Sequence, residues 1–98
     1  MTMSASVIRR AYRFTGIVQG VGFRWRARHA AAGMGITGWI RNEWDGSVVM
    51  EAQGTEFQLN EMLKAINRGT YIVIDNIESR DIPVKEDERG FSVRYGDR

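Results

Sequence analysis

The stretch Gly16-Ile17-Val18-Gln19-Gly20-Val21-Gly22-Phe23-Arg24 joins an alternating, β-rich segment to a segment with helical periodicity. Its three glycines allow a tight turn and remove side chains that would block a ligand. A strand that enters a helix through such a turn directs unpaired backbone N–H groups, and the positive end of the helix dipole, toward one point. This arrangement predicts an anion site, and phosphate is the usual occupant.

Arg24 strengthens this interpretation. Glycines in a turn can serve the turn alone, so Gly20 and Gly22 by themselves favour the structural role. An arginine in the first turn of a helix opposes the dipole, and a bound anion would remove that conflict. Its planar guanidinium also suits two phosphate oxygens.

Hydrophobic periodicity around this turn predicts two helices and five strands. The first helix covers residues 23–34 and ends near Gly33 and Gly35, and the second opens at residues 54–56 with Thr55 and Gln58 spaced as a capping box. The second helix ends at Gly69. The strands are expected over residues 9–18, 36–42, 47–53, 71–82 and 91–95, with an Asp45-Gly46 turn in the central hairpin.

The order of these elements predicts an α+β fold. Each helix is a crossover, the central hairpin is antiparallel, and both helices have to cover one face of the sheet. The result is a ferredoxin-like βαββαβ two-layer sandwich with a short extra C-terminal strand and a mixed, mostly antiparallel sheet. We expect residues 9–98 to form one domain and residues 1–8 to be a flexible N-terminal extension.

Composition excludes several classes of protein. The 98 residues contain no cysteine, which argues against disulfides, thiolate metal sites and a cysteine nucleophile. No apolar run has the length of a membrane span and the N-terminus lacks a signal-peptide core, so a soluble cytoplasmic protein is expected. Residues 1–42 hold seven arginines and no acid, although the net charge is only +2. The glycine turn therefore lies in the basic part of the chain, where anions are attracted.

A second block follows the glycine turn, Gly38-Trp39-Ile40-Arg41-Asn42-Glu43-Trp44-Asp45-Gly46, and a weaker one ends the chain, Phe91-Ser92-Val93-Arg94-Tyr95. In order and spacing, these blocks resemble the acylphosphatase family over nearly the whole chain. The resemblance implies the ferredoxin-like fold and an enzyme that hydrolyses acyl phosphates. It also implies that Asn42 positions the attacking water, whereas the residues alone would make Asn42 a turn asparagine.

The residue types agree with this chemistry. An acyl phosphate expels a carboxylate, whose conjugate acid has a pKa of about 4, so no general acid is required. We expect substrate phosphate to bind the loop of residues 19–24, with Arg24 and Asn42 as the catalytic residues. The predicted phosphate-binding residues are Gln19, Gly20, Val21, Gly22, Phe23 and Arg24. No cofactor and no metal are expected, and the substrate is a small molecule bound by a monomer.

Parts of the sequence also fit two other functions, nucleic-acid or anion binding and an accessory domain of a larger protein. Ferredoxin-like sheets often bind RNA, and a basic half with aromatic strands suits a nucleic-acid- or anion-binding module, but the aromatic-rich strand motif is missing. The alternative of an accessory domain from a larger carbamoyl-phosphate-handling protein is disfavoured because the chain ends soon after its last strand. Trp39, Trp44 and His29 are expected to pack or face solvent. Most arginines outside the turn, including Arg9 on a strand and Arg28 on a helix exterior, are expected on solvent faces. The run at residues 85–89 is expected to be a solvated loop.

Overall fold

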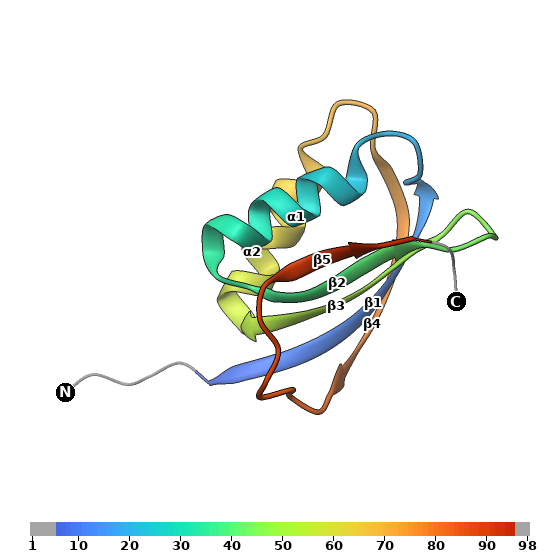
Figure 1. The fold of residues 1–98 in the computed structure, drawn as a ribbon. Helices are drawn as coiled ribbons and strands as arrows, with labels where there is room; N and C mark the ends of the chain where they lie inside the picture. Colours follow the sequence, from blue (N-terminus) through green and yellow to red (C-terminus); the bar gives the residue numbers. More distant parts are fainter. Residues whose placement is uncertain (1–5, 96–98) are drawn as a thin grey trace.

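The computed structural model describes residues 6–95, arranged as two helices on one face of a five-stranded sheet (Figure 1). The strands are β1 (Val7–Ile17), β2 (Thr37–Asn42), β3 (Val48–Thr55), β4 (Val73–Ile82) and β5 (Phe91–Arg94), and the helices are α1 (Phe23–Met34) and α2 (Glu56–Asn67). This is the predicted ferredoxin-like α+β sandwich with an extra C-terminal strand. Residues 1–5 of the expected N-terminal extension lie outside the described residues.

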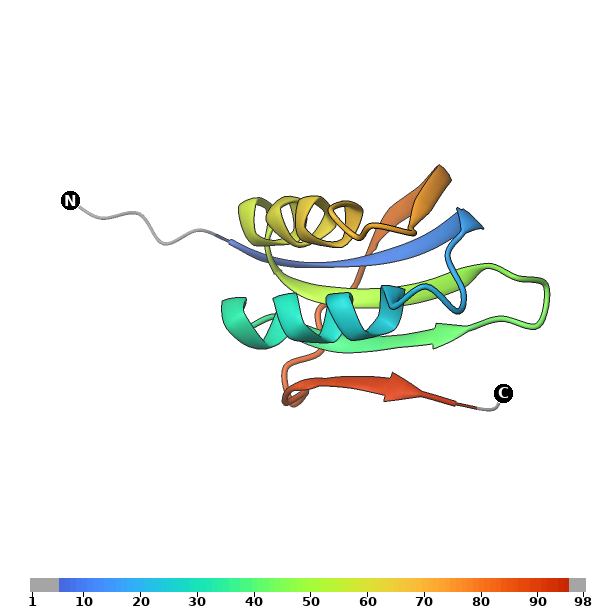
Figure 2. The ribbon, with the colours of Figure 1, turned by 90° about the horizontal axis from the view of Figure 1, so that it is seen from above.

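The sheet has the order β4-β1-β3-β2-β5. β1 is antiparallel to both β3 and β4, and β2 is antiparallel to β3 but parallel to β5, so the sheet is mixed and mostly antiparallel as predicted. Figure 2 shows that the β1–α1 loop and the ends of β2 and β5 lie at the same end of the molecule. The topology therefore brings three separate segments of the sequence together at one site.

The end of α1 and the start of α2 are set by signals that are local in the sequence. Gly35 caps α1 in the left-handed conformation, with φ of 70°, and its N–H donates to Ala31 O. At the start of α2, the Thr55 side chain accepts from the Gln58 N–H while the Gln58 side chain accepts from the Thr55 N–H. The predicted α1 bounds and the predicted capping box of α2 are both confirmed.

The core lies between the helices and the inner face of the sheet. Alternate residues of the central strands point into it, because successive strand side chains face opposite sides. The fully or nearly fully buried members include Phe14, Phe23, Ile40, Val48, Met50, Leu59, Met62 and Ile66. Neither helix is long and apolar enough to cross a membrane within the described part of the chain.

The segment between β4 and β5 differs from its prediction. β4 and β5 are opposite edges of the sheet, so residues 83–90 have to cross it (Figure 1). There Glu88 forms two hydrogen bonds to Arg9, of 2.7 and 3.1 Å, and the Arg9 side chain is completely buried. The expectations of a solvated loop at residues 85–89 and of an exposed Arg9 are therefore wrong at these two positions.

Candidate active site

The glycine turn is held in place by the core. β1 ends at Ile17, and the buried side chains of Val18 and Phe23 anchor the two ends of the connection to α1. Between them, Gly20 and Gly22 have φ angles of 74° and 83°, in the region that favours glycine. A Cβ atom at either position would meet open space, so the two glycines set the path of the backbone and do not relieve a clash.

The backbone amides of this turn have no acceptor among the described residues. Within residues 6–95, the N–H groups of residues 19–22 donate to no other protein group. The first hydrogen bond of α1 runs from Arg26 N to Gly22 O, at 3.0 Å, so the three preceding amides of the helix also lack an intrahelical acceptor. Such a group of free donors at a helix N-terminus suits an oxyanion.

A pocket of about 240 Å³ opens beside these amides. It is formed where the turn and the first two turns of α1 face the ends of β2 and β5. Its lining comprises Val18, Gly20, Gly22, Phe23, Arg24, Trp25, Arg28, Asn42, Val93 and Tyr95. The two residues predicted to be catalytic, Arg24 and Asn42, therefore line one pocket although 18 residues separate them in the sequence.

Asn42 is the last residue of β2, where it pairs with Val48 of β3. Its Oδ1 atom is buried and has no hydrogen-bond partner in the described protein. Buried polar atoms are nearly always satisfied, by protein or by ordered water. An unsatisfied amide oxygen beside an anion-sized pocket is therefore suited to hold a water molecule.

Arg24 lies with its guanidinium carbon 5.1 Å from the ring centroid of Tyr95, the residue that follows β5. This is the distance range of a cation–π contact. No carboxylate among residues 6–95 pairs with Arg24. Its charge is therefore oriented by an aromatic ring and left uncompensated toward the pocket.

The Gln19 side chain connects the turn to the β2–β3 hairpin and does not line the pocket. Its Nε2 donates to the carbonyl oxygens of Glu43 and Ser47, at 2.7 and 2.8 Å, and so connects the turn to the β2–β3 hairpin. Val21 packs against the core. Four of the six predicted phosphate-binding residues line the pocket, namely Gly20, Gly22, Phe23 and Arg24, whereas Gln19 and Val21 do not.

Acidic residues of the adjacent hairpin are paired with nearby groups. Asp45 accepts hydrogen bonds from the Ser47 N–H and hydroxyl, at 3.0 and 2.7 Å, and pairs with Arg13. These bonds from Ser47, followed by the charge of Arg13, lower the pKa of Asp45. Glu43 pairs with Arg41 at 2.6 Å. Neither of these two acids lines the pocket, so the positive charge of Arg24 remains available to an anion.

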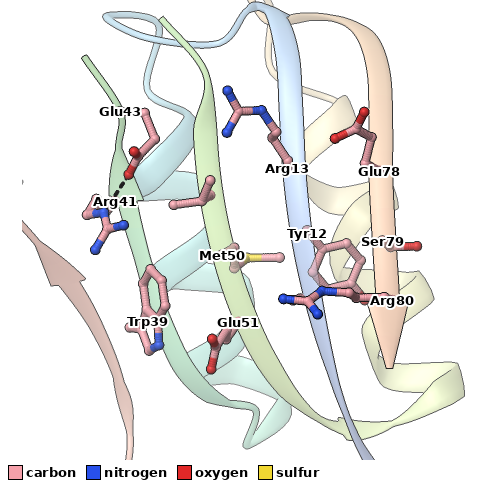
Figure 3. A pocket seen from close by; sticks show the side chains of 12 residues that line it. Tyr12, Arg13, Trp39, Arg41, Glu43, Met50, Glu51, Glu78, Ser79 and Arg80 are labelled. Carbon is pink, nitrogen blue, oxygen red and sulfur yellow. Dashed lines mark hydrogen bonds and ion pairs between the residues drawn. The ribbon is translucent and has the colours of Figure 1, made fainter. Parts of the chain in front are cut away.

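A second, larger pocket of about 410 Å³ lies on the outer face of the sheet (Figure 3). Its charged residues are largely paired, as Arg41 with Glu43 and Glu51 with Arg9. Trp39 is only 9% exposed, and the guanidinium groups of Arg41 and Arg94 lie 5.2 and 4.5 Å from its ring centroid. Trp39 thus packs as expected and is poorly placed to stack on a nucleic-acid base.

The histidine and the acidic side chains of the described residues form no further site. His29 is exposed and stacks on Trp25, with ring centroids 4.6 Å apart. No group of three or more His, Cys, Asp or Glu side chains is arranged to bind a metal in the part of the chain that the structure describes.

Residue-based prediction missed five of the ten residues that line the pocket, among them the apolar Val18 and Trp25. Arg28, Val93 and Tyr95 line it, but Arg28 was expected on a solvated helix surface and Tyr95 in a generic last strand. The four-residue spacing between Arg24 and Arg28 was a usable signal, because residues i and i+4 share one face of a helix.

Comparisons with known proteins agree with this geometry. The acylphosphatase family model matches residues 10–93. An acylphosphatase from Geobacillus kaustophilus is 44% identical over 83% of this chain and 87% of its own length, and one from Lactobacillus johnsonii is 42% identical over 85% and 93%. The crystal structure of acylphosphatase from Bacillus subtilis superposes with a TM-score of 0.82 at 28% identity, covering 92% of this chain and all of the other.

Proposed function

The chain belongs to the acylphosphatase family, and we propose that it hydrolyses the carboxyl–phosphate bond of acyl phosphates in the pocket between the glycine turn and the end of β2. One observation supports the proposal most strongly. The pocket combines the unpaired amides of the turn, the unpaired guanidinium of Arg24 and the unpartnered Oδ1 of Asn42. These groups are, respectively, donors for an oxyanion, a positive charge and an acceptor for a water proton.

In the proposed mechanism, the phosphoryl group binds to the amides of residues 19–24 while Arg24 donates to two of its oxygens. A water molecule that donates a hydrogen bond to Asn42 Oδ1 is held in line with the bond to be broken. Tyr95 positions the Arg24 guanidinium through its ring. The protein thus contributes binding, charge stabilisation and orientation.

The bonds formed and the bonds broken in this reaction balance without a side-chain acid or base. The water oxygen forms a bond to phosphorus, and the phosphorus–oxygen bond to the acyl group breaks with its electron pair on the carboxylate. The proton lost by water moves to a phosphate oxygen, giving inorganic phosphate. Because the conjugate acid of the leaving group has a pKa of about 4, the carboxylate leaves unprotonated at neutral pH. An amide such as that of Asn42 cannot act as the base.

Replacement of Arg24 tests the proposal. We expect Arg24→Ala to lower kcat/KM for benzoyl phosphate by about a hundredfold or more, because it removes the side-chain charge that faces the phosphate. Arg24→Lys should recover only part of this loss, since a lysine lacks the planar fork. Arg89→Ala, in the loop before β5, is the charge-matched control and should keep the parental rate. A folded Arg24→Ala protein with parental activity would refute the assignment.

A further inference from the structure

Besides Arg24, the pocket is lined by a second arginine. Arg28 lies one helical turn beyond Arg24 on α1 and lines the same pocket. Side chains at this spacing are neighbours, with Cβ atoms about 6 Å apart. Trp25, Val93 and Tyr95 add apolar surface to the lining. A substrate whose phosphate is bound at the turn would therefore extend its carbon skeleton toward apolar walls and a guanidinium.

Arg28 is also uncompensated. Arg9, Arg10, Arg13 and Arg41 each pair with a carboxylate. Among residues 6–95 Arg28 pairs with none, and neither do Arg24, Arg26, Arg68, Arg80, Arg89 and Arg94. Of these unpaired arginines, only Arg24 and Arg28 line the pocket. Two like charges at positions i and i+4 destabilise a helix by a few tenths of a kcal/mol. A ligand with anionic groups at both positions would turn that repulsion into attraction.

We propose that Arg28 binds a carboxylate on the acyl part of the substrate, so that the preferred substrates are monoacyl phosphates of dicarboxylic acids. The inference rests on the proposed function, because it assumes that phosphate occupies the turn. Carboxylate suits Arg28 because the planar guanidinium can donate to both of its oxygens. Arg28 is thus a specificity-determining residue, and the bond-breaking step needs Arg24 and Asn42 only.

A matched pair of substrates tests this proposal. Benzoyl phosphate and 4-carboxybenzoyl phosphate share a rigid ring and differ in one carboxylate. We expect the parental protein to have the higher kcat/KM for the carboxylated substrate. Arg28→Gln should lower the ratio of the two kcat/KM values by about tenfold, the effect of one charge-assisted hydrogen bond at a partly exposed position. Arg28→Lys should retain part of the preference.

Arg89→Gln serves as the control, because it removes an arginine from the opposite end of β5 and should leave the ratio unchanged. A ratio that is the same in Arg28→Gln and in the parent would overturn the proposal. A second measurement distinguishes failure of the Arg28 subsite from failure of the proposed function. Calorimetry gives the affinities of the protein for 2-phenylethylphosphonate and for its 4-carboxy derivative. If neither substrate is hydrolysed, the proposed function fails. In that case the Arg28 subsite is supported if the parental protein binds the carboxylated phosphonate more tightly and Arg28→Gln abolishes this preference. It is refuted if the parental protein shows no such preference.

Discussion

At position 42, an asparagine that served only as a turn residue would lower the stability of the fold. At the end of β2 its Oδ1 atom is buried and receives no hydrogen bond from residues 6–95. Leaving a buried acceptor unsatisfied costs about 1–3 kcal/mol. A water molecule bound there would offset this cost and would lie beside the unpaired amides of the turn. The same unsatisfied atom therefore supports the proposed orientation of water.

We predict that Asn42→Ala lowers kcat for benzoyl phosphate by about a hundredfold, because the attacking water loses its orientation. KM should change little, since the turn and Arg24 still bind the phosphoryl group. Steady-state kinetics at saturating substrate provide the measurement. Asn76→Ala, an exposed asparagine within β4, is the matched control. An unchanged kcat in Asn42→Ala would remove Asn42 from the mechanism.

Sequence reasoning grouped the turn, Arg24 and Asn42, which line one pocket, but it gave no sign that the Gln19 side chain bonds to the β2–β3 hairpin. The turn follows from glycines that are adjacent in the sequence. The direction of the Gln19 side chain depends on the carbonyl groups of Glu43 and Ser47, which are 24 and 28 residues away. Contacts of that kind are set by the tertiary fold, so no local pattern could reveal them.

At the scale of the element, α1 was predicted more accurately than β1 for the same reason, whereas α2 ends at Asn67, two residues before the predicted Gly69. α1 was predicted with its observed bounds because Gly35 ends it locally. The start of β1 was placed at residue 9, although the strand begins at Val7, where it pairs with Thr55. The ends of a strand depend on how far its partner extends, and that information lies elsewhere in the chain.

At Gly38 the backbones of β2 and β3 approach each other closely. This glycine has φ of 146°, and a Cβ atom there would lie 1.9 Å from the carbonyl oxygen of Glu51 on β3. Neither strand can move freely, because Trp39 and Ile40 of β2 are buried directly beside the glycine. The glycine of the Gly38-Trp39 motif is therefore required by backbone packing.

We predict that Gly38→Ala destabilises the protein by about 3 kcal/mol or more, because the clash involves backbone atoms and the φ angle is unfavourable for alanine. Urea denaturation followed by circular dichroism measures the change. Gly90→Ala is the control, since Gly90 has φ of 71° but open space around the added atom. It should cost only about 1 kcal/mol. Equal losses in the two variants would show that φ alone matters and would refute the packing argument.

At the scale of the whole molecule, one ion-pair cluster around the buried Arg9 joins two interior strands to the segment that crosses the sheet. Arg9 of β1 bonds to Glu51 and Gln53 of β3 and to Glu88 of the β4–β5 segment. Sequence reasoning missed this cluster, because a strand arginine and a charged run both have compositions typical of solvent-exposed surface. Only the strand order, which forces residues 83–90 across the sheet, brings Glu88 over Arg9.

This cluster makes stability dependent on pH. Burial by itself would raise the pKa of Glu88, but its hydrogen bonds to Arg9 and the neighbouring positive charges outweigh burial, so the pKa lies below the ordinary value of 4.5. A carboxylate whose pKa is lowered by folding stabilises the fold above its unfolded pKa. That stabilisation is lost as the pH falls through the folded pKa.

We therefore predict that Glu88→Gln lowers the free energy of unfolding by about 2 kcal/mol at neutral pH. The change leaves the Arg9 charge buried, although Glu51 still pairs with it. The difference from the parent should shrink as the pH falls from the ordinary carboxyl pKa of 4.5 through the lowered pKa of the folded state, because the parental Glu88 becomes protonated too. Urea denaturation at neutral pH and near pH 3 measures both values. Glu86→Gln, an exposed acid two residues earlier, should have little effect at either pH. A Glu88→Gln difference that does not depend on pH would contradict the assignment of this stabilisation to the charge of Glu88.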